Sequence, residues 1–167
     1  MDLATWVPFF TAAAGASAAL VGLLIVAMSV NVESIVRIAS MPSRAAATIS
    51  SLSIVVVISV LALIPGLDAV WLGVVVLVCS LGAVGFATDS MVRLLRDAGG
   101  HGEITTPFER VIRAVVGVIP VLVCAIGGVL LLAGLTTAGL VLTAVGFALA
   151  FLVAVLNTWV ILIEIRR

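Results

Sequence analysis

The side chains that could do chemistry in this sequence are few. The only histidine, His101, stands in a Gly-Gly-His-Gly stretch next to Glu103. One histidine with one carboxylate is too small a set for a metal site, which needs three or four ligands. We therefore expect His101 to lie in an ordinary loop, with a pH-responsive loop as the alternative.

The apolar runs of the chain lack the groups needed for acid, base or nucleophilic catalysis. No Asp, Glu, Lys, Arg or His lies near the middle of any run, whereas coupled transporters usually hold an ionisable group at that depth. Cys79 and Cys124 lie within apolar runs, where a thiol usually acts as a small hydrophobe, and no base accompanies them. A disulfide would require the two cysteines to face each other. The sequence predicts a protein that is not an enzyme, with no catalytic residue, metal site, cofactor or nucleic-acid partner.

Polar residues gather instead near the ends of the first and last apolar runs. An amide such as Asn157, about two turns inside the last run, must find a hydrogen-bond partner there. Ser29 and Asn31 of the first run lie at a similar depth, so we expect one of them to bond Asn157, with a ligand or ion site as the alternative. Glu33 and Glu164 are expected to pair with nearby arginines at the membrane surface.

The same two runs each carry a stripe of small residues. Small residues let helices approach closely where lipid supplies no hydrophobic drive. For the first stripe two interpretations stay open: packing against its own bundle, or a subunit interface or pore-lining helix. The first stripe consists of Gly15, Ala18, Gly22 and Ser29, and the last of Gly139, Thr143, Gly146, Ala150, Asn157 and Glu164.

These stripes belong to segments long enough to cross a membrane. The chain of 167 residues is 64% hydrophobic and 10% charged, whereas about 25% of residues in a soluble domain are charged. Crossing the hydrocarbon takes about 20 apolar residues. The pattern predicts an all-α polytopic helix bundle, a single domain over residues 1–167, with five spans at about 6–30, 45–64, 70–88, 111–133 and 138–163.

The arginines predict the orientation of this bundle. All eight basic residues are Arg, and they lie in the segments 31–44 and 89–113 and at the C-terminus. These segments share one side of the membrane, which the positive-inside rule makes cytoplasmic. We therefore expect an outside N-terminus, a cytoplasmic loop at 89–110, a cytoplasmic C-terminus and a multi-pass location in a bacterial plasma (inner) membrane.

Local signals set the ends of the helices. Turns are expected at 65–68 and 134–139, where Gly and Pro gather. Opposite charges at Asp89, Arg93 and Asp97 extend the third span beyond the bilayer, and Thr106 is a candidate N-cap before Pro107. Aromatic side chains are expected at headgroup level, namely Trp6, Phe9, Phe10, Trp71 and Trp159.

Two resemblances concern the first span. Residues 6–33, with their Phe-Phe, Ala-Ser-Ala-Ala-Leu and Ser-Val-Asn elements, resemble small uncharacterised bacterial multi-pass membrane proteins, which implies a family but no function. A shorter stretch resembles the pore helix of Orai calcium channels. There the position of the selectivity-filter glutamate is occupied by Val30, so calcium selectivity is not implied. The matching residues are Ser17, Ala18, Leu20, Gly22, Val26, Ala27 and Met28.

The sequence thus predicts a homo-oligomeric channel-like assembly with the first helix near its axis. Rings of polar side chains at the end of such a helix are what a selective pore uses. The alternatives are a non-conducting scaffold or accessory subunit bound to a membrane-protein partner, and a lipid-binding membrane protein; membrane lipid is the expected surrounding in each case. The candidate pore or interface residues are Gly15, Gly22, Ser29, Asn31, Glu33, Asn157 and Glu164.

Overall fold

Every element in the described part of the chain is a helix. The computed structural model describes residues 3–32, 41–97 and 107–165, and within these it describes the backbone alone for 41–44, 86–97, 107–116 and 160–165. A short 3-10 helix, η1 (Leu3–Trp6), precedes α1 (Val7–Val30), α3 (Met41–Ala62), α4 (Ala69–Asp97), α5 (Pro107–Leu132) and α6 (Thr136–Ile165).

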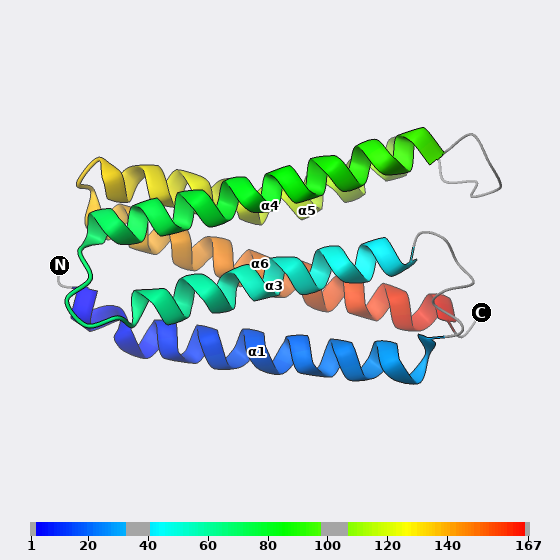
Figure 1. Ribbon diagram of the computed structural model, residues 1–167, viewed down its shortest axis with the longest axis horizontal. Coiled ribbons are helices and arrows are strands. Elements are labelled where there is room, and N and C mark those ends of the chain that lie inside the picture. The colour runs from blue at the N-terminus through cyan, green and yellow to red at the C-terminus, as the bar shows by residue number, and fades with distance from the viewer. Residues whose placement is uncertain (1–2, 33–40, 98–106, 166–167) are drawn as a thin grey trace.

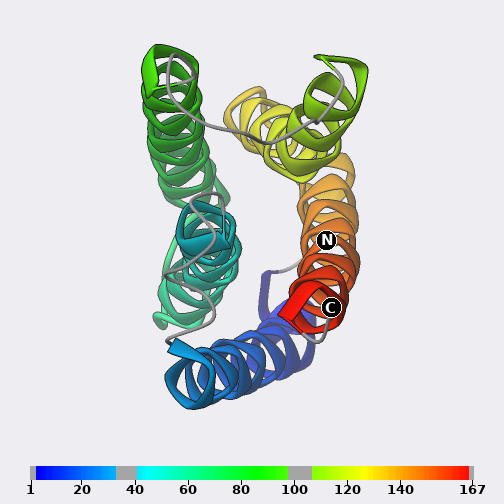
Figure 2. The same ribbon diagram turned by 90° about the vertical axis from the view of Figure 1, so that its right-hand side faces the viewer.

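Successive helices run in opposite directions along one long axis (Figure 1). Short turns join α3 to α4 and α5 to α6 at one end, which we call the hairpin end. The main contacts follow the chain, α1 with α3, α3 with α4, α4 with α5 and α5 with α6, and α3 also packs on α6. Helix α1 lies at the edge of the bundle, with little contact to α6 (Figure 2).

Among the described residues, three helical segments are long and apolar enough to cross a membrane: Leu3–Val30, Ala45–Ala62 and Thr136–Trp159. Helices α4 and α5 carry shorter apolar stretches within the described part, Ala69–Gly85 and Gly117–Leu132. The all-α prediction is confirmed. All five predicted spans fall on helices, while the five-span topology and its orientation stay predictions.

The two turns at the hairpin end depend on glycines with positive φ. Gly66 has φ +77° and Gly134 has φ +78°. This is a backbone region that residues other than glycine rarely adopt. At the end of α5 the Gly134 N–H bonds to the Leu131 carbonyl (3.1 Å) and the Leu135 N–H to the Leu130 carbonyl (3.0 Å), which is a Schellman motif. The expected turn at 134–139 was too long, because α6 already begins at Thr136.

The helices next to the longer connection begin and end where the sequence indicated. Helix α4 continues to Asp97, past the apolar stretch, and α5 begins at Pro107. Proline is favoured at a first helical position because its missing N–H would have no partner there. The predicted cap Thr106 lies outside the described residues.

The core contains an aromatic cluster of side chains that the sequence pattern placed at the membrane surface. Phe10 is 1% exposed, its ring lies 6.4 Å from that of Phe147, and Phe9 stacks on Phe147 at 6.2 Å. The prediction that Phe9 and Phe10 lie at headgroup level was wrong, since both pack against α6. Trp71 and Trp159 are exposed, as an interfacial position requires.

Candidate functional site

Helix α1 has one buried face and one wide exposed face. Phe10, Ala13, Ser17 and Leu24 are buried, and their spacing places them on the side that packs on α3. In the apolar stretch of α1 17% of residues are buried, compared with 39% in those of α3 and α6. Helix α1 is therefore the least enclosed of the three long apolar helices.

The small-residue stripe lies on the exposed face of α1. Gly15, Ala18, Gly22 and Ser29 are all exposed. A Cβ built on Gly15 or on Gly22 would meet nothing within 4 Å. Of the two interpretations left open by the sequence, packing of this stripe within its own bundle is thus wrong for the chain as described.

Polar side chains at the end of α1 each donate one hydrogen bond to the helix itself. The Ser29 hydroxyl donates to the Ile25 carbonyl (2.8 Å), and the Asn31 side-chain amide donates to the Ala27 carbonyl (2.9 Å). Because a carbonyl can only accept, the nitrogen of the Asn31 amide faces the helix. The Asn31 Oδ1 and both lone pairs of Ser29 Oγ remain as acceptors, and one N–H of the Asn31 amide remains as a donor.

Asn157 does not pair with α1. Its Nδ2 donates to Thr48 Oγ1 of α3 at 3.4 Å, so the predicted partners Ser29 and Asn31 were wrong. The reason is the helix order: α6 packs on α3 and scarcely touches α1. Glu33 lies outside the described residues, and Glu164 lies in the last turn of α6 with its side chain outside the described part.

The stripe on α6 is packed against α5. Gly139, Thr143, Gly146 and Ala150 are buried. A Cβ on Gly139 would lie 2.9 Å from the Gly127 carbonyl oxygen, and a Cβ on Gly146 would meet the Cys124 sulfur and lie 3.1 Å from the Pro120 carbonyl oxygen. The absence of these side chains is what lets α5 and α6 approach so closely.

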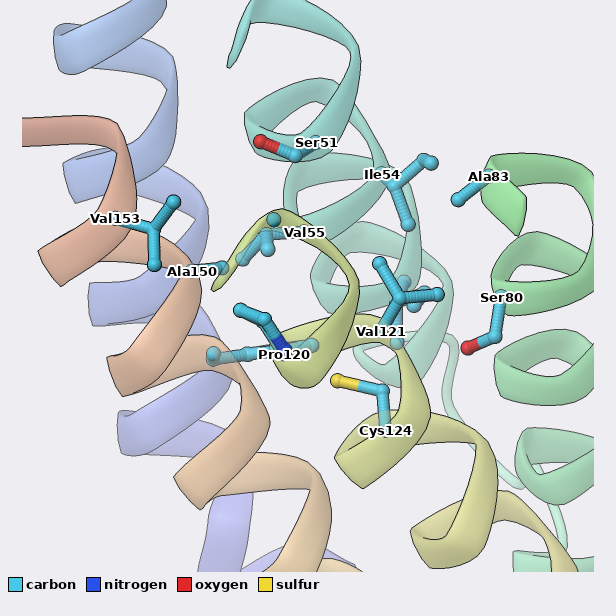
Figure 3. A pocket seen from close by; sticks show the side chains of 13 residues that line it. Ser51, Ile54, Val55, Ser80, Ala83, Pro120, Val121, Cys124, Ala150 and Val153 are labelled. Atoms are coloured by element: carbon cyan, nitrogen blue, oxygen red, sulfur yellow. The ribbon is translucent and has the colours of Figure 1, made fainter. Parts of the chain in front are cut away.

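A pocket of about 40 Å³ lies between α3, α4, α5 and α6 (Figure 3). Its described walls are mostly aliphatic, with Phe147 and two serine hydroxyls, Ser51 and Ser80, and no charged residue is among the described lining residues. Sequence reasoning missed it. The available signal was Pro120, a proline inside α5 that lines the pocket and that deprives the carbonyl four residues earlier of its helical donor.

Both cysteines are free: Cys124 is buried and lines the pocket, while Cys79 is partly buried. Cys124 Sγ lies 3.9 Å from the Thr143 carbonyl oxygen, a weak contact that holds the thiol against α6. Within the described residues no three His, Cys, Asp or Glu side chains come together. His101 lies outside the described residues, so its role stays a prediction.

The described chain is thus an all-helical protein whose long apolar helices suit a membrane. No family model, curated protein or solved structure matches it. The resemblances to small bacterial membrane proteins and to the Orai pore helix therefore stay predictions.

Proposed function

We propose that this chain is a five-span membrane protein whose copies assemble through the exposed small-residue stripe of α1 into a channel-like homo-oligomer. The observation that carries the proposal is the exposure of Gly15, Ala18, Gly22 and Ser29 on a helix at the edge of the bundle. Helices in lipid associate by close backbone contact. Because this stripe contacts no described helix of its own chain, it is suited to a close contact with a helix of another copy.

The helix ends support the proposed topology. Helix α3 begins, α4 ends, α5 begins and α6 ends at the end opposite the hairpins (Figure 1). The sequence positions of Arg44, Arg93, Arg96, Arg110 and Arg113 fall within these terminal segments. An arginine-rich end is the one that stays in the cytoplasm.

The polar end of α1 favours cations over anions at the mouth of such an assembly. The Ser29 hydroxyl hydrogen is bonded to the helix, so Ser29 offers only oxygen lone pairs. The C-terminal end of a helix also carries the negative part of its dipole. Repeated around an axis, the exposed Ser29 hydroxyls of the stripe form the kind of oxygen ring that replaces part of the hydration shell of a cation.

The test compares identical glycine substitutions at different places. The double variant Gly15→Leu/Gly22→Leu should reduce the oligomer to monomers in mild detergent and abolish cation flux into liposomes. The matched control is Gly82→Leu on α4, an exposed glycine whose Cβ also meets nothing within 4 Å. It should leave both mass and flux unchanged.

A wild-type particle that is strictly monomeric contradicts the proposal, as does flux no higher than that of empty vesicles. Recovery from native membranes in a stable complex with a different protein, dissociated by the same double variant, would favour the accessory-subunit alternative for this stripe.

A further inference from the structure

We propose that the pocket between α3, α4, α5 and α6 takes in a short segment of one aliphatic chain that enters from the bilayer, and that Ser80 selects a chain with an oxygen acceptor at mid-depth. The inference rests on the proposed membrane embedding but not on the oligomer. The pocket shares no residue with the stripe on α1.

The depth of the pocket limits what can reach it. Phe147, in its wall, lies about 17 Å along α6 from Thr136 and about 18 Å from Trp159 at about 1.5 Å per residue, so it is central in the apolar segment Thr136–Trp159. At the middle of a bilayer the abundant species are acyl chains. The uncharged and mainly aliphatic walls suit such a chain better than they suit water, which needs two to four polar partners.

The spacing of α4 and α5 supplies an entrance. Near the hairpin end a Cβ on Gly73 would lie 3.0 Å from the Gly128 carbonyl oxygen, so the two helices touch there. Further along, a Cβ on Gly117 of α5 would meet nothing within 4 Å. The far ends of α4 and α5 lie on opposite sides of the bundle (Figure 2). Gly117 lines the pocket and is itself exposed, so it marks the open side.

Ser80 gives the pocket a polar preference. Its side chain is 2% exposed, and Figure 3 shows its hydroxyl directed from α4 toward Val121 and Cys124. The other pocket hydroxyl, on Ser51, bonds to the Thr48 carbonyl at 2.9 Å, whereas no described residue bonds the Ser80 hydroxyl. A buried hydroxyl without a partner is costly in an apolar medium. An oxygen carried on the bound chain would accept its proton.

An ordinary phospholipid cannot supply that oxygen. Its ester carbonyls lie near the headgroups, about 15 Å from the centre of a hydrocarbon core about 30 Å thick. At the depth of Ser80 it offers only methylene groups. The preferred ligand class is therefore a lipid-soluble chain with a keto, ether or similar uncharged oxygen along its length.

The experiment uses a phospholipid that carries a photoreactive diazirine at mid-chain, with the protein in liposomes. Cross-links to pocket residues such as Val121 are expected, mapped by mass spectrometry. Gly117→Leu should block the entrance and remove them. Since a Cβ at 117 meets open space, this variant should fold, and Gly82→Leu is again the matched control that keeps the pocket cross-links.

Competition then tests the role of Ser80. A phospholipid with a mid-chain keto group should displace the photoreactive lipid about five-fold better than the same lipid without the keto group, the effect of one net hydrogen bond. Ser80→Ala should abolish this preference and keep the cross-links. If the two lipids displace the photoreactive lipid equally well from the wild-type protein, the proposed selection by Ser80 is wrong.

Two other results would overturn the chain site itself. One is cross-linking confined to outward side chains such as Leu122 and Val129, which are exposed. The other is rapid modification of Cys124 by a charged, water-soluble thiol reagent in a Cys79→Ala background, since that reagent requires a water-filled pocket. No cross-link anywhere on the protein would instead contradict the membrane embedding on which the proposed function rests.

Discussion

The small-residue stripes of α1 and α6 have similar compositions and opposite surroundings. On α6, Gly139 and Gly146 lie against the backbone of α5, with no room for a side chain. On α1, Gly15 and Gly22 face open space. Small residues therefore indicate that a helix face suits a close contact, and they do not tell whether the partner belongs to the same chain.

The largest expected effect comes from enlarging the buried stripe. Gly146→Leu places a side chain against the Cys124 sulfur and the Pro120 carbonyl, and backbone atoms cannot move aside easily. We expect a loss of about 3 kcal/mol or more in the free energy of unfolding, measured by SDS titration in micelles. A stable Gly146→Leu protein with unchanged α5–α6 cross-linking would break the comparison.

A smaller effect is expected where the α6 stripe leaves α5 and reaches α3. Asn157→Leu removes the hydrogen bond to Thr48 Oγ1, and interhelical hydrogen bonds of this kind are worth about 0.6 kcal/mol on average in membrane proteins. The same titration measures it. Thr48 makes a further interaction, so a double-mutant cycle with Thr48→Val is needed to isolate the pair. A coupling energy of zero would show that the two side chains do not bond.

Replacing Ser59 on α3 should stabilise the protein, whereas the two substitutions above destabilise it. It is fully buried and its Oγ has no partner among the described residues. Ser59→Ala should raise the free energy of unfolding by about 1 kcal/mol, because an unpaired buried hydroxyl is removed. Ser17→Ala is the control, since the Ser17 hydroxyl bonds to the Ala13 carbonyl and its removal should bring no gain. Destabilisation by Ser59→Ala would mean that Ser59 has a partner after all.

The smallest effect on a single subunit is expected at the exposed stripe. Gly22→Leu should change the stability of the isolated monomer by less than about 0.5 kcal/mol, as for other surface substitutions. Its influence should appear only in the mass of the assembly. Destabilisation of the monomer as large as that of Gly146→Leu would mean that α1 packs within its own chain.

The helices could be predicted well from the sequence because long apolar runs, prolines and glycines set their ends directly. Pro107 and Gly134 mark helix limits where the structure has them. Contacts between helices could not be predicted in the same way. Asn157 at a given depth could reach several helices, and the sequence does not state that α3, rather than α1, packs beside α6.

The pocket could not be predicted from the sequence for a related reason, because it depends on contacts between helices. Ser80 is one of many serines in apolar runs, and several described serine and threonine hydroxyls bond back to their own helix, as those of Ser29 and Thr158 do. Whether a hydroxyl has such a bond depends on its rotamer and its neighbours. Only the divergence of α4 from α5 gives Ser80 its position beside a pocket.

In the proposed five-span topology, the turn at Gly134 also bears on how the chain enters a bilayer during synthesis. Only Ala133, Gly134 and Leu135 separate α5 from α6, and the glycines of the two helices are in contact close to this turn. A connection this short cannot hold one helix inside a translocation pore while the other waits outside. We therefore expect α5 and α6 to leave the insertion machinery together, as a preformed hairpin, so that the pair is the unit of biogenesis.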